Sequence, residues 1–199
     1  MERWKKILKI ILIAVPAAFV LFFMIYAFFT WPVYHSFTKE VDSYDKLCAP
    51  FKDSNEIFLP DEDDIPTEGY ILHMDGRSLF AKPVSYCINK TENRGDFSVR
   101  YQLNSSVKGG TPCKGTQEYH GVAYDVISEE RQLENKPDYY GVYLLFDINK
   151  VYYRFDATYN TDTQSPEAAK ATEEQLRAQL ETYAKQVIDK YNASLADLD

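Results

Sequence analysis

The chain has 199 residues, of which 45% are apolar and 26% are charged, and its formal net charge is −8. These values exclude a disordered chain, a collagen-like fibre and a small scaffold that depends on dense disulfides. The acidic balance also argues against a nucleic-acid partner, because nucleic-acid-binding domains present a basic surface.

The N-terminal segment has the pattern of a membrane anchor. Residues 1–9 contain four basic side chains and one acid, and residues 10–29 contain no charge. Twenty helical residues span about 30 Å, which matches the hydrocarbon thickness of a bilayer. The run is longer than the apolar region of a cleavable signal peptide, and no pair of small residues follows it as a cleavage site. The sequence therefore predicts a transmembrane helix over residues 10–31, with the lipid bilayer as its partner.

The distribution of charge predicts the orientation of this helix. Basic residues that flank a membrane span stay on the cytoplasmic side, so residues 1–9 form a cytoplasmic tail and the C-terminal part is extracytoplasmic. The tail carries +3, which leaves −11 for the residues beyond the span. We expect a single-pass protein of the cell membrane whose exported domain is repelled by anionic headgroups.

Residues 32–66 show little periodicity and are expected to form an acidic juxtamembrane connector. The connector ends in residues 59–66, where four consecutive acids lie between two prolines. Proline and the residue before it favour extended backbone. Clustered acids can bind Ca²⁺, but calcium loops alternate their ligands and contain a turn glycine, which this stretch lacks. We therefore predict no metal site.

From Gly69 onward the sequence is rich in Tyr, Val, Ile and Phe, separated by turn residues, which is typical of β-strands. Several strands alternate apolar and polar side chains, as in an antiparallel sheet that is covered on one face. The last two are close enough in sequence to form a hairpin. The predicted strands cover residues 69–74, 78–89, 96–107, 117–127, 140–148 and 151–159.

After Asn160 the period changes from two residues to about 3.6. Ser165, Pro166 and Glu167 form a helix start, with a hydroxyl cap, a proline at the first helical position and an acid that the helix dipole favours. An apolar stripe then includes Leu176, Leu180, Tyr183, Val187, Tyr191 and Leu195. The helix is expected as one piece of about thirty residues or as two pieces broken near Ala171.

These elements predict an α+β domain over residues 67–199. Its antiparallel β-sheet is a meander of about five or six strands, and the long C-terminal helix covers one face. This length is sufficient to bury a core without metals or staples.

The three cysteines all lie on the predicted extracytoplasmic side, where disulfides persist. A hairpin that turns near residues 91–95 would place Cys87 opposite a residue near Val99, and Cys113 well beyond reach of a bridge. The predicted disulfide therefore joins Cys48 and Cys113. The alternative is three reduced cysteines.

His73 and Asp75 are the candidate catalytic pair. They lie two residues apart on a predicted strand and so share one face, which suits an oriented base and equally suits two polar residues on a wet sheet surface. The sequence lacks the motifs of zinc proteases, serine hydrolases, dithiol oxidoreductases and phosphate-binding loops. We therefore assign no catalytic residue, no metal ligand and no cofactor.

Aromatic content points to a binding surface instead. Fourteen tyrosines lie beyond Ser36, and many belong to the last hairpin. Exposed tyrosine combines a large ring with a hydrogen-bonding group, as interfaces require, although half-buried sheet tyrosines give the same pattern. The candidate binding residues are Tyr140, Tyr143, Tyr152 and Arg154.

The leading hypothesis is a membrane-anchored, non-catalytic domain that binds a protein or an envelope polymer, for example as an accessory subunit of a membrane assembly. One alternative is an anchored, hydrolase-like envelope enzyme that uses His73 and Asp75. Another is a sensor that acts through a partner, because a nine-residue tail cannot carry an output domain. The sequence determines neither the partner nor the oligomeric state.

Overall fold

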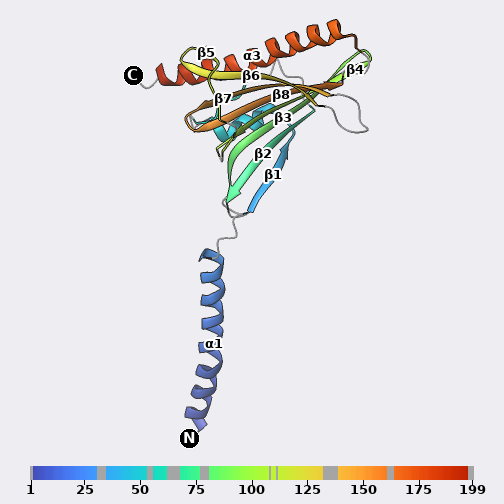
Figure 1. The fold of residues 1–199 in the computed structure, drawn as a ribbon. Coiled ribbons are helices and arrows are strands. Elements are labelled where there is room, and N and C mark those ends of the chain that lie inside the picture. The colour runs from blue at the N-terminus through green and yellow to red at the C-terminus, as the bar shows by residue number, and fades with distance from the viewer. Residues whose placement is uncertain are drawn as a thin grey trace. The chain divides into compact units, whose positions relative to one another are not determined.

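Figure 1 shows the computed structural model of the chain. The structure describes residues 2–30, 35–52, 56–61, 68–76, 81–107, 109–110, 112–131, 139–160 and 164–196. The chain divides into two compact units. One comprises Met1–His35 with Gly76–Ala81, and the other comprises Ser36–Asp75 with Lys82–Asp199.

The first unit contains helix α1, Glu2–Thr30, a continuous helix of 29 residues with Pro16 in its interior. Every side chain from Ile13 to Tyr26 is exposed. Among the residues described, no helix meets the combined length and apolarity of a membrane span. The transmembrane helix that the sequence predicts over residues 10–31 stays a prediction.

The second unit is built on one sheet, in which the eight described strands have the order β1-β2-β3-β4-β8-β7-β6-β5. Two four-stranded meanders, β1 to β4 and β5 to β8, meet where β4 pairs with β8. In this order, each pair of neighbouring strands from β2 through β3, β4, β8, β7 and β6 to β5 is antiparallel. The strands are β1 His35–Val41, β2 Gly69–Gly76, β3 Lys82–Arg94, β4 Phe97–Ser106, β5 Gln117–Tyr119, β6 Val122–Arg131, β7 Tyr139–Ile148 and β8 Val151–Asn160.

The predicted α+β class, the antiparallel sheet and the C-terminal helix are confirmed. The strand count was underestimated, partly because the strand predicted over residues 117–127 is two strands. His120 and Gly121 separate them with φ values of 46° and 82°, the left-handed pair that a two-residue hairpin turn requires. The His120 side chain is compatible with strand alternation, so the sequence pattern did not reveal this turn.

The segment predicted as a connector contributes to the folded domain. Besides β1 it contains α2, Tyr44–Cys48, and a 3-10 turn, η1, Ala49–Phe51. Leu47, Phe51, Ile57 and Leu59 from this segment are buried in the main core. Such short elements bury one residue each and so leave no periodicity to detect. The acids at 62–64 lie outside the described residues.

Helix α3, Pro166–Ala196, is one piece of 31 residues. The Ser165 hydroxyl accepts a hydrogen bond from the Ala168 amide at 3.3 Å, which confirms the predicted cap. Leu176, Leu180, Tyr183 and Val187 are buried, whereas Leu195 remains 43% exposed. In Figure 1, α3 lies across β6, β7 and β8.

The sheet therefore has two faces of different character. The face under α3, which we call the helix face, carries alternate residues of β8 such as Tyr153, Phe155 and Tyr159, all buried. The opposite side, which we call the open face, carries the residues between them, Tyr152, Arg154 and Asp156. The candidate binding residues are distributed over these two faces.

Candidate functional site

Three of the four predicted binding residues share one face. Tyr143 on β7 pairs with Asp156 on β8, so Tyr143 lies on the open face with Tyr152 and Arg154. Tyr140 lies three residues earlier on β7 and so belongs to the helix face. Its ring centroid is 6.0 Å from that of Tyr159, and it lines a pocket of about 460 Å³ beside the start of α3. The structure does not bring Tyr140 to the other three.

Arg154 is the centre of the open-face cluster. Its guanidinium lies 4.7 Å from the centroid of the Tyr143 ring, which is a cation–π distance. Its Nε donates to the Asp156 carboxylate, at 2.8 Å to Oδ1 and 3.1 Å to Oδ2. The Arg154 side chain is 45% exposed, so its outer edge can bind another molecule while its inner edge is held.

The two open-face tyrosines are less exposed than the sequence suggested. Tyr143 is only 6% exposed, and its ring occupies the space above Gly141, where any Cβ would meet the Tyr143 hydroxyl. Tyr152 is half-buried and packs against Gly110, whose Cβ would lie 2.7 Å from that of Tyr152. The buried Tyr143 ring thus packs against the Arg154 guanidinium. The accessible surface consists of Arg154 and part of Tyr152.

A second feature of the open face, which the sequence analysis missed, is a clasp around Asp125 on β6. Its buried carboxylate accepts backbone N–H bonds from Gly115 at 3.3 Å and Thr116 at 2.8 Å, and a further one from Lys114. Burial by itself raises the pKa of Asp125, but these N–H bonds outweigh it and hold that pKa well below its usual value. The clasp fixes the loop before β5 onto β6.

The cysteines are all free thiols, so the predicted Cys48–Cys113 disulfide is not formed in this structure. Cys48 ends α2, whereas the Cys113 thiol donates to the Ala123 carbonyl on β6 at 3.7 Å. The expected position of Cys87 opposite Val99 was also wrong. Cys87 pairs with Asn104, because β3 continues to Arg94 and the hairpin turn is shorter than assumed.

His73 and Asp75 lie on the same face of β2, as predicted, and both line a cleft of about 670 Å³. They are the only titratable groups among the described residues that line this cleft. The other lining residues are Ser36, Phe37, Thr38, Met74, Val84, Ser85, Asn104, Ser105, Ser106 and Val107. In the described part of the chain, no group of three or more His, Cys, Asp or Glu residues could hold a metal ion.

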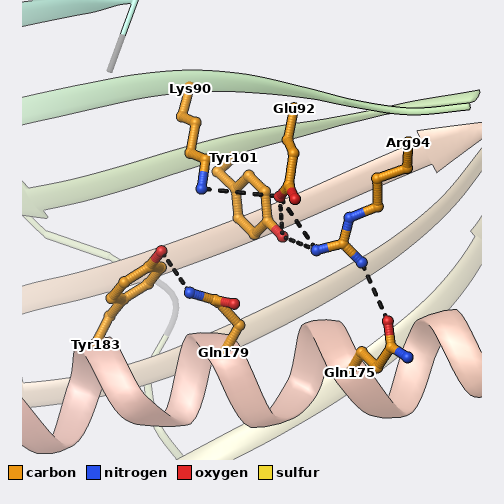
Figure 2. A network of polar contacts seen from close by, with 7 residues as sticks. All are labelled: Lys90, Glu92, Arg94, Tyr101, Gln175, Gln179 and Tyr183. Atoms are coloured by element: carbon orange, nitrogen blue, oxygen red, sulfur yellow. Dashed lines mark hydrogen bonds and ion pairs between the residues drawn. The ribbon is translucent and has the colours of Figure 1, made fainter. Parts of the chain in front are cut away.

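Figure 2 shows a charged network on the helix face, which sequence reasoning also missed. Lys90, Glu92 and Arg94 alternate along β3 and so point to one side. Glu92 Oε2 lies 3.8 Å from Lys90 Nζ and 3.1 Å from Arg94 Nη2. Lys90 is only 6% exposed, and burial lowers its pKa although the nearby Glu92 opposes this shift. Alternating charges on a strand usually indicate a solvent face, but these lie on the helix face, where Arg94 contacts Gln175 of α3.

The network connects the sheet to α3. Arg94 donates to the Gln175 side chain at 3.3 Å and to the Tyr101 hydroxyl at 3.1 Å. The Lys90 ammonium lies 4.9 Å from the centroid of the Tyr101 ring. On α3, Gln179 donates to Tyr183 at 2.8 Å. Since Arg94 on β3 contacts Gln175 on α3 across the helix–sheet interface, the network serves to position α3.

Comparisons with protein-family models, curated proteins and solved structures find no match to this chain. The described part of the chain offers two candidate sites, the open-face cluster around Arg154 and the cleft beside His73.

Proposed function

We propose that the chain is a single-pass membrane protein whose extracytoplasmic domain binds a protein or an envelope polymer without catalysis. The observation that carries the membrane assignment is α1, in which the fourteen apolar residues from Ile13 to Tyr26 are helical and all exposed. Leaving a large apolar side chain in water instead of burying it costs about 1.5–3 kcal/mol. A bilayer removes this cost, and it also suits a helix that is apolar on every side.

The charge distribution supports the proposed orientation. Residues 1–9 carry +3 and the residues beyond the uncharged run carry −11. A basic tail favours the cytoplasmic side of the membrane, and an acidic domain is repelled by anionic lipid headgroups. A domain held away from the lipid surface keeps its open face accessible to a partner.

The proposed contact surface is Arg154 with the exposed part of Tyr152. Arginine and tyrosine are among the residues that dominate binding energy at interfaces. Asp156 and Tyr143 hold the Arg154 side chain before any partner arrives. Such preorganisation reduces the rotamer entropy that binding would otherwise cost.

An anchored, hydrolase-like enzyme is the second candidate, because His73 and Asp75 share a cleft. It is less well supported, since no third titratable group is among the described residues lining that cleft. A membrane sensor that acts through a partner would use the same anchor and the same contact surface, and it differs only in what the partner does.

The topology is tested by membrane fractionation and protease accessibility of the full chain. We expect wild-type protein in the carbonate-resistant membrane fraction, with the C-terminal domain digested by external protease. Replacing Val20 and Phe22 together by Arg should release the protein, because each central arginine costs about 2.5–3.5 kcal/mol on insertion. Leucine at both positions is the matched control. Recovery of the wild type in the soluble fraction would contradict the proposal.

The contact surface is tested by pull-down of the detergent-extracted full chain from its own envelope. We expect a partner that is recovered by the wild type and lost from Arg154→Ala. Lys170→Ala is the matched control, because this exposed cation lies on α3, away from the open face. Retention on envelope polymer in the absence of protein would select the polymer as the ligand. Equal recovery by Arg154→Ala and wild type would refute the assigned surface.

A further inference from the structure

The cleft beside His73 and the Arg154 surface adjoin one another on the open face. Asn104 on β4 is the register partner of Arg154 on β8. Ser106, two residues later on β4, pairs with Tyr152. Register partners in an antiparallel pair point to the same side of the sheet, with Cβ atoms about 4.5–5.5 Å apart. Asn104 and Ser106 also line the cleft. The cleft, Tyr152 and Arg154 therefore form one surface, which we call the open-face groove.

Three polar side chains in this groove have hydrogen-bonding capacity that the fold does not use. Ser85 on β3 is only 8% exposed, yet it lines the cleft, and its hydroxyl bonds to no described residue. His73 and Asn104 line the cleft as well, and the described part of the chain supplies neither side chain with a hydrogen-bond partner. Polar groups that are largely buried normally have such a partner. These side chains are therefore suited to bind a ligand.

The rest of the lining combines aromatic rings with short polar side chains. Phe37 on β1 lines the cleft and is 40% exposed, and Tyr152 on β8 is half-buried. Between these two strands, β3 and β4 contribute the hydroxyl of Ser85 and the amide of Asn104. A sugar ring has C–H groups on its faces and hydroxyls around its edge. It can therefore pack on an aromatic ring while its hydroxyls bond to side chains that both donate and accept.

The charges around the groove are paired. Asp156 holds Arg154, and Asp75, which has a partner of its own, stands opposite Lys82 in the register of β2 and β3. A cationic protein segment would need a carboxylate without a partner, and neither Asp75 nor Asp156 meets that need. The charge of −11 beyond the uncharged run repels an anionic polymer. These features favour a neutral ligand.

We propose that the open-face groove binds a neutral polysaccharide chain, whose hydroxyls bond to Ser85 and Asn104 and whose rings pack on Phe37 and Tyr152. Ligand sites typically enclose about 300–1,000 Å³. The cleft alone provides about 670 Å³, so it holds part of the chain while the remainder crosses Arg154. The inference rests on the proposed function, because it names an envelope polymer, and not a protein, as the ligand of the Arg154 surface.

The probes are cellohexaose and chitohexaose, which are neutral, and hexagalacturonate, which is anionic. Each is added to the full chain in a detergent without a sugar headgroup, and binding is measured by calorimetry. We expect at least one neutral hexamer to bind with a Kd below about 1 mM. Hexagalacturonate should bind more weakly than that hexamer at low salt, because the acidic domain repels it.

Variants locate the site. Asn104→Ala should weaken binding of the neutral hexamer by about tenfold, because it removes a donor and an acceptor where the cleft meets Arg154. Asn93→Ala is the matched control, since it removes an exposed amide from the same face at the hairpin end of β3. Thr38→Trp should abolish binding by filling the cleft from β1, and the exposed Ser98→Trp, at the far end of β4, is its control. Circular dichroism confirms that each variant is folded.

The proposal is overturned if neither neutral hexamer binds at about 1 mM, the weak limit of useful affinity, or if hexagalacturonate binds more tightly than both. Hexamer binding that Asn104→Ala leaves unchanged would overturn it as well. Recovery of a protein partner that depends on Arg154, without binding of any hexamer, would refute the polysaccharide and leave the proposed function standing. Cleavage of a bound hexamer would support the groove as the polysaccharide site and refute function without catalysis.

Discussion

Replacing Glu92 by glutamine tests the charged network in Figure 2. Glutamine keeps a side-chain oxygen for Arg94 and the Tyr101 hydroxyl but removes the negative charge that lies beside Lys90 and Arg94. Lys90 would then be a buried ammonium without a counter-ion, which is among the most destabilising arrangements in a folded protein. We therefore expect Glu92→Gln to lower the free energy of unfolding.

The magnitude follows from the distances and the exposure. At 3.8 Å to Lys90 and 3.1 Å to Arg94, each attraction amounts to about 4–5 kcal/mol at an effective dielectric constant near 20. Desolvation offsets much of this, and Glu92 is 37% exposed, so solvent screens the remainder. A net loss of about 2 kcal/mol remains, which lowers Tm by about 4–8 °C in a domain of this size.

The assay is urea unfolding followed by far-ultraviolet circular dichroism on the detergent-solubilised full chain. The double variant Lys90→Met, Glu92→Gln should recover to within about 1 kcal/mol of the wild type, because methionine fills the buried site without a charge. Asp42→Asn is the matched control. It weakens an exposed ion pair with Lys46 and should leave the free energy of unfolding almost unchanged.

The acid dependence gives an independent readout. Burial alone would raise the pKa of Glu92, but the hydrogen bond and the charge of Arg94 lower it below 4.5 overall. The stabilisation is therefore present above pH 4.5 and is lost as the pH falls through the folded-state pKa. Glu92→Gln should flatten this loss. A Glu92→Gln variant as stable as the wild type, or one that Lys90→Met fails to rescue, would refute the reasoning.

Three further outcomes are expected. Asp125→Asn should release the clasped loop and lower the free energy of unfolding by about 2 kcal/mol. Because the pKa of Asp125 is lowered in the folded protein, the advantage of the wild type should fade below pH 3.8. Equal proteolysis of the loop in both proteins would count against this prediction. Leu180→Ala should cost about 2–5 kcal/mol in unfolding experiments, whereas exposed Leu195→Ala should cost less than about 0.5 kcal/mol. Burial raises the pKa of Cys113 to about 11, so iodoacetamide should label it slowly at pH 8; labelling as fast as free cysteine would contradict this environment.

Regular elements with strong periodicity were predictable. The stripe from Leu176 to Val187 and the alternation along β4 each reflect burial on one side, and local sequence records that burial directly. The tight turn at His120 was not predictable, because histidine is compatible with a strand and only the positive φ values reveal the turn. Short elements such as α2 were missed for a related reason. Leu47 is the one buried side chain of α2, and a single buried residue produces no periodic pattern.

The candidate sites were predictable only in part. Two-residue alternation correctly placed His73 beside Asp75, and Tyr152 beside Arg154. It could not indicate which face α3 covers, although the same alternation already separates Tyr140 from Tyr143, which lies three residues later on β7. Nor could it show that Tyr143 is buried, because this follows from the absence of a side chain at Gly141, two residues earlier on the same strand.

The sequence by itself determined the α+β class, the antiparallel pairing of the last two strands and the helix that covers them, because these depend on local propensity and periodic burial. It also determined the division of charge into a +3 tail and a −11 remainder. Only the tertiary structure decided which strands distant in sequence become neighbours. The pairing of β4 with β8 and the burial of Lys90 arise from contacts between separate elements, which no local pattern records.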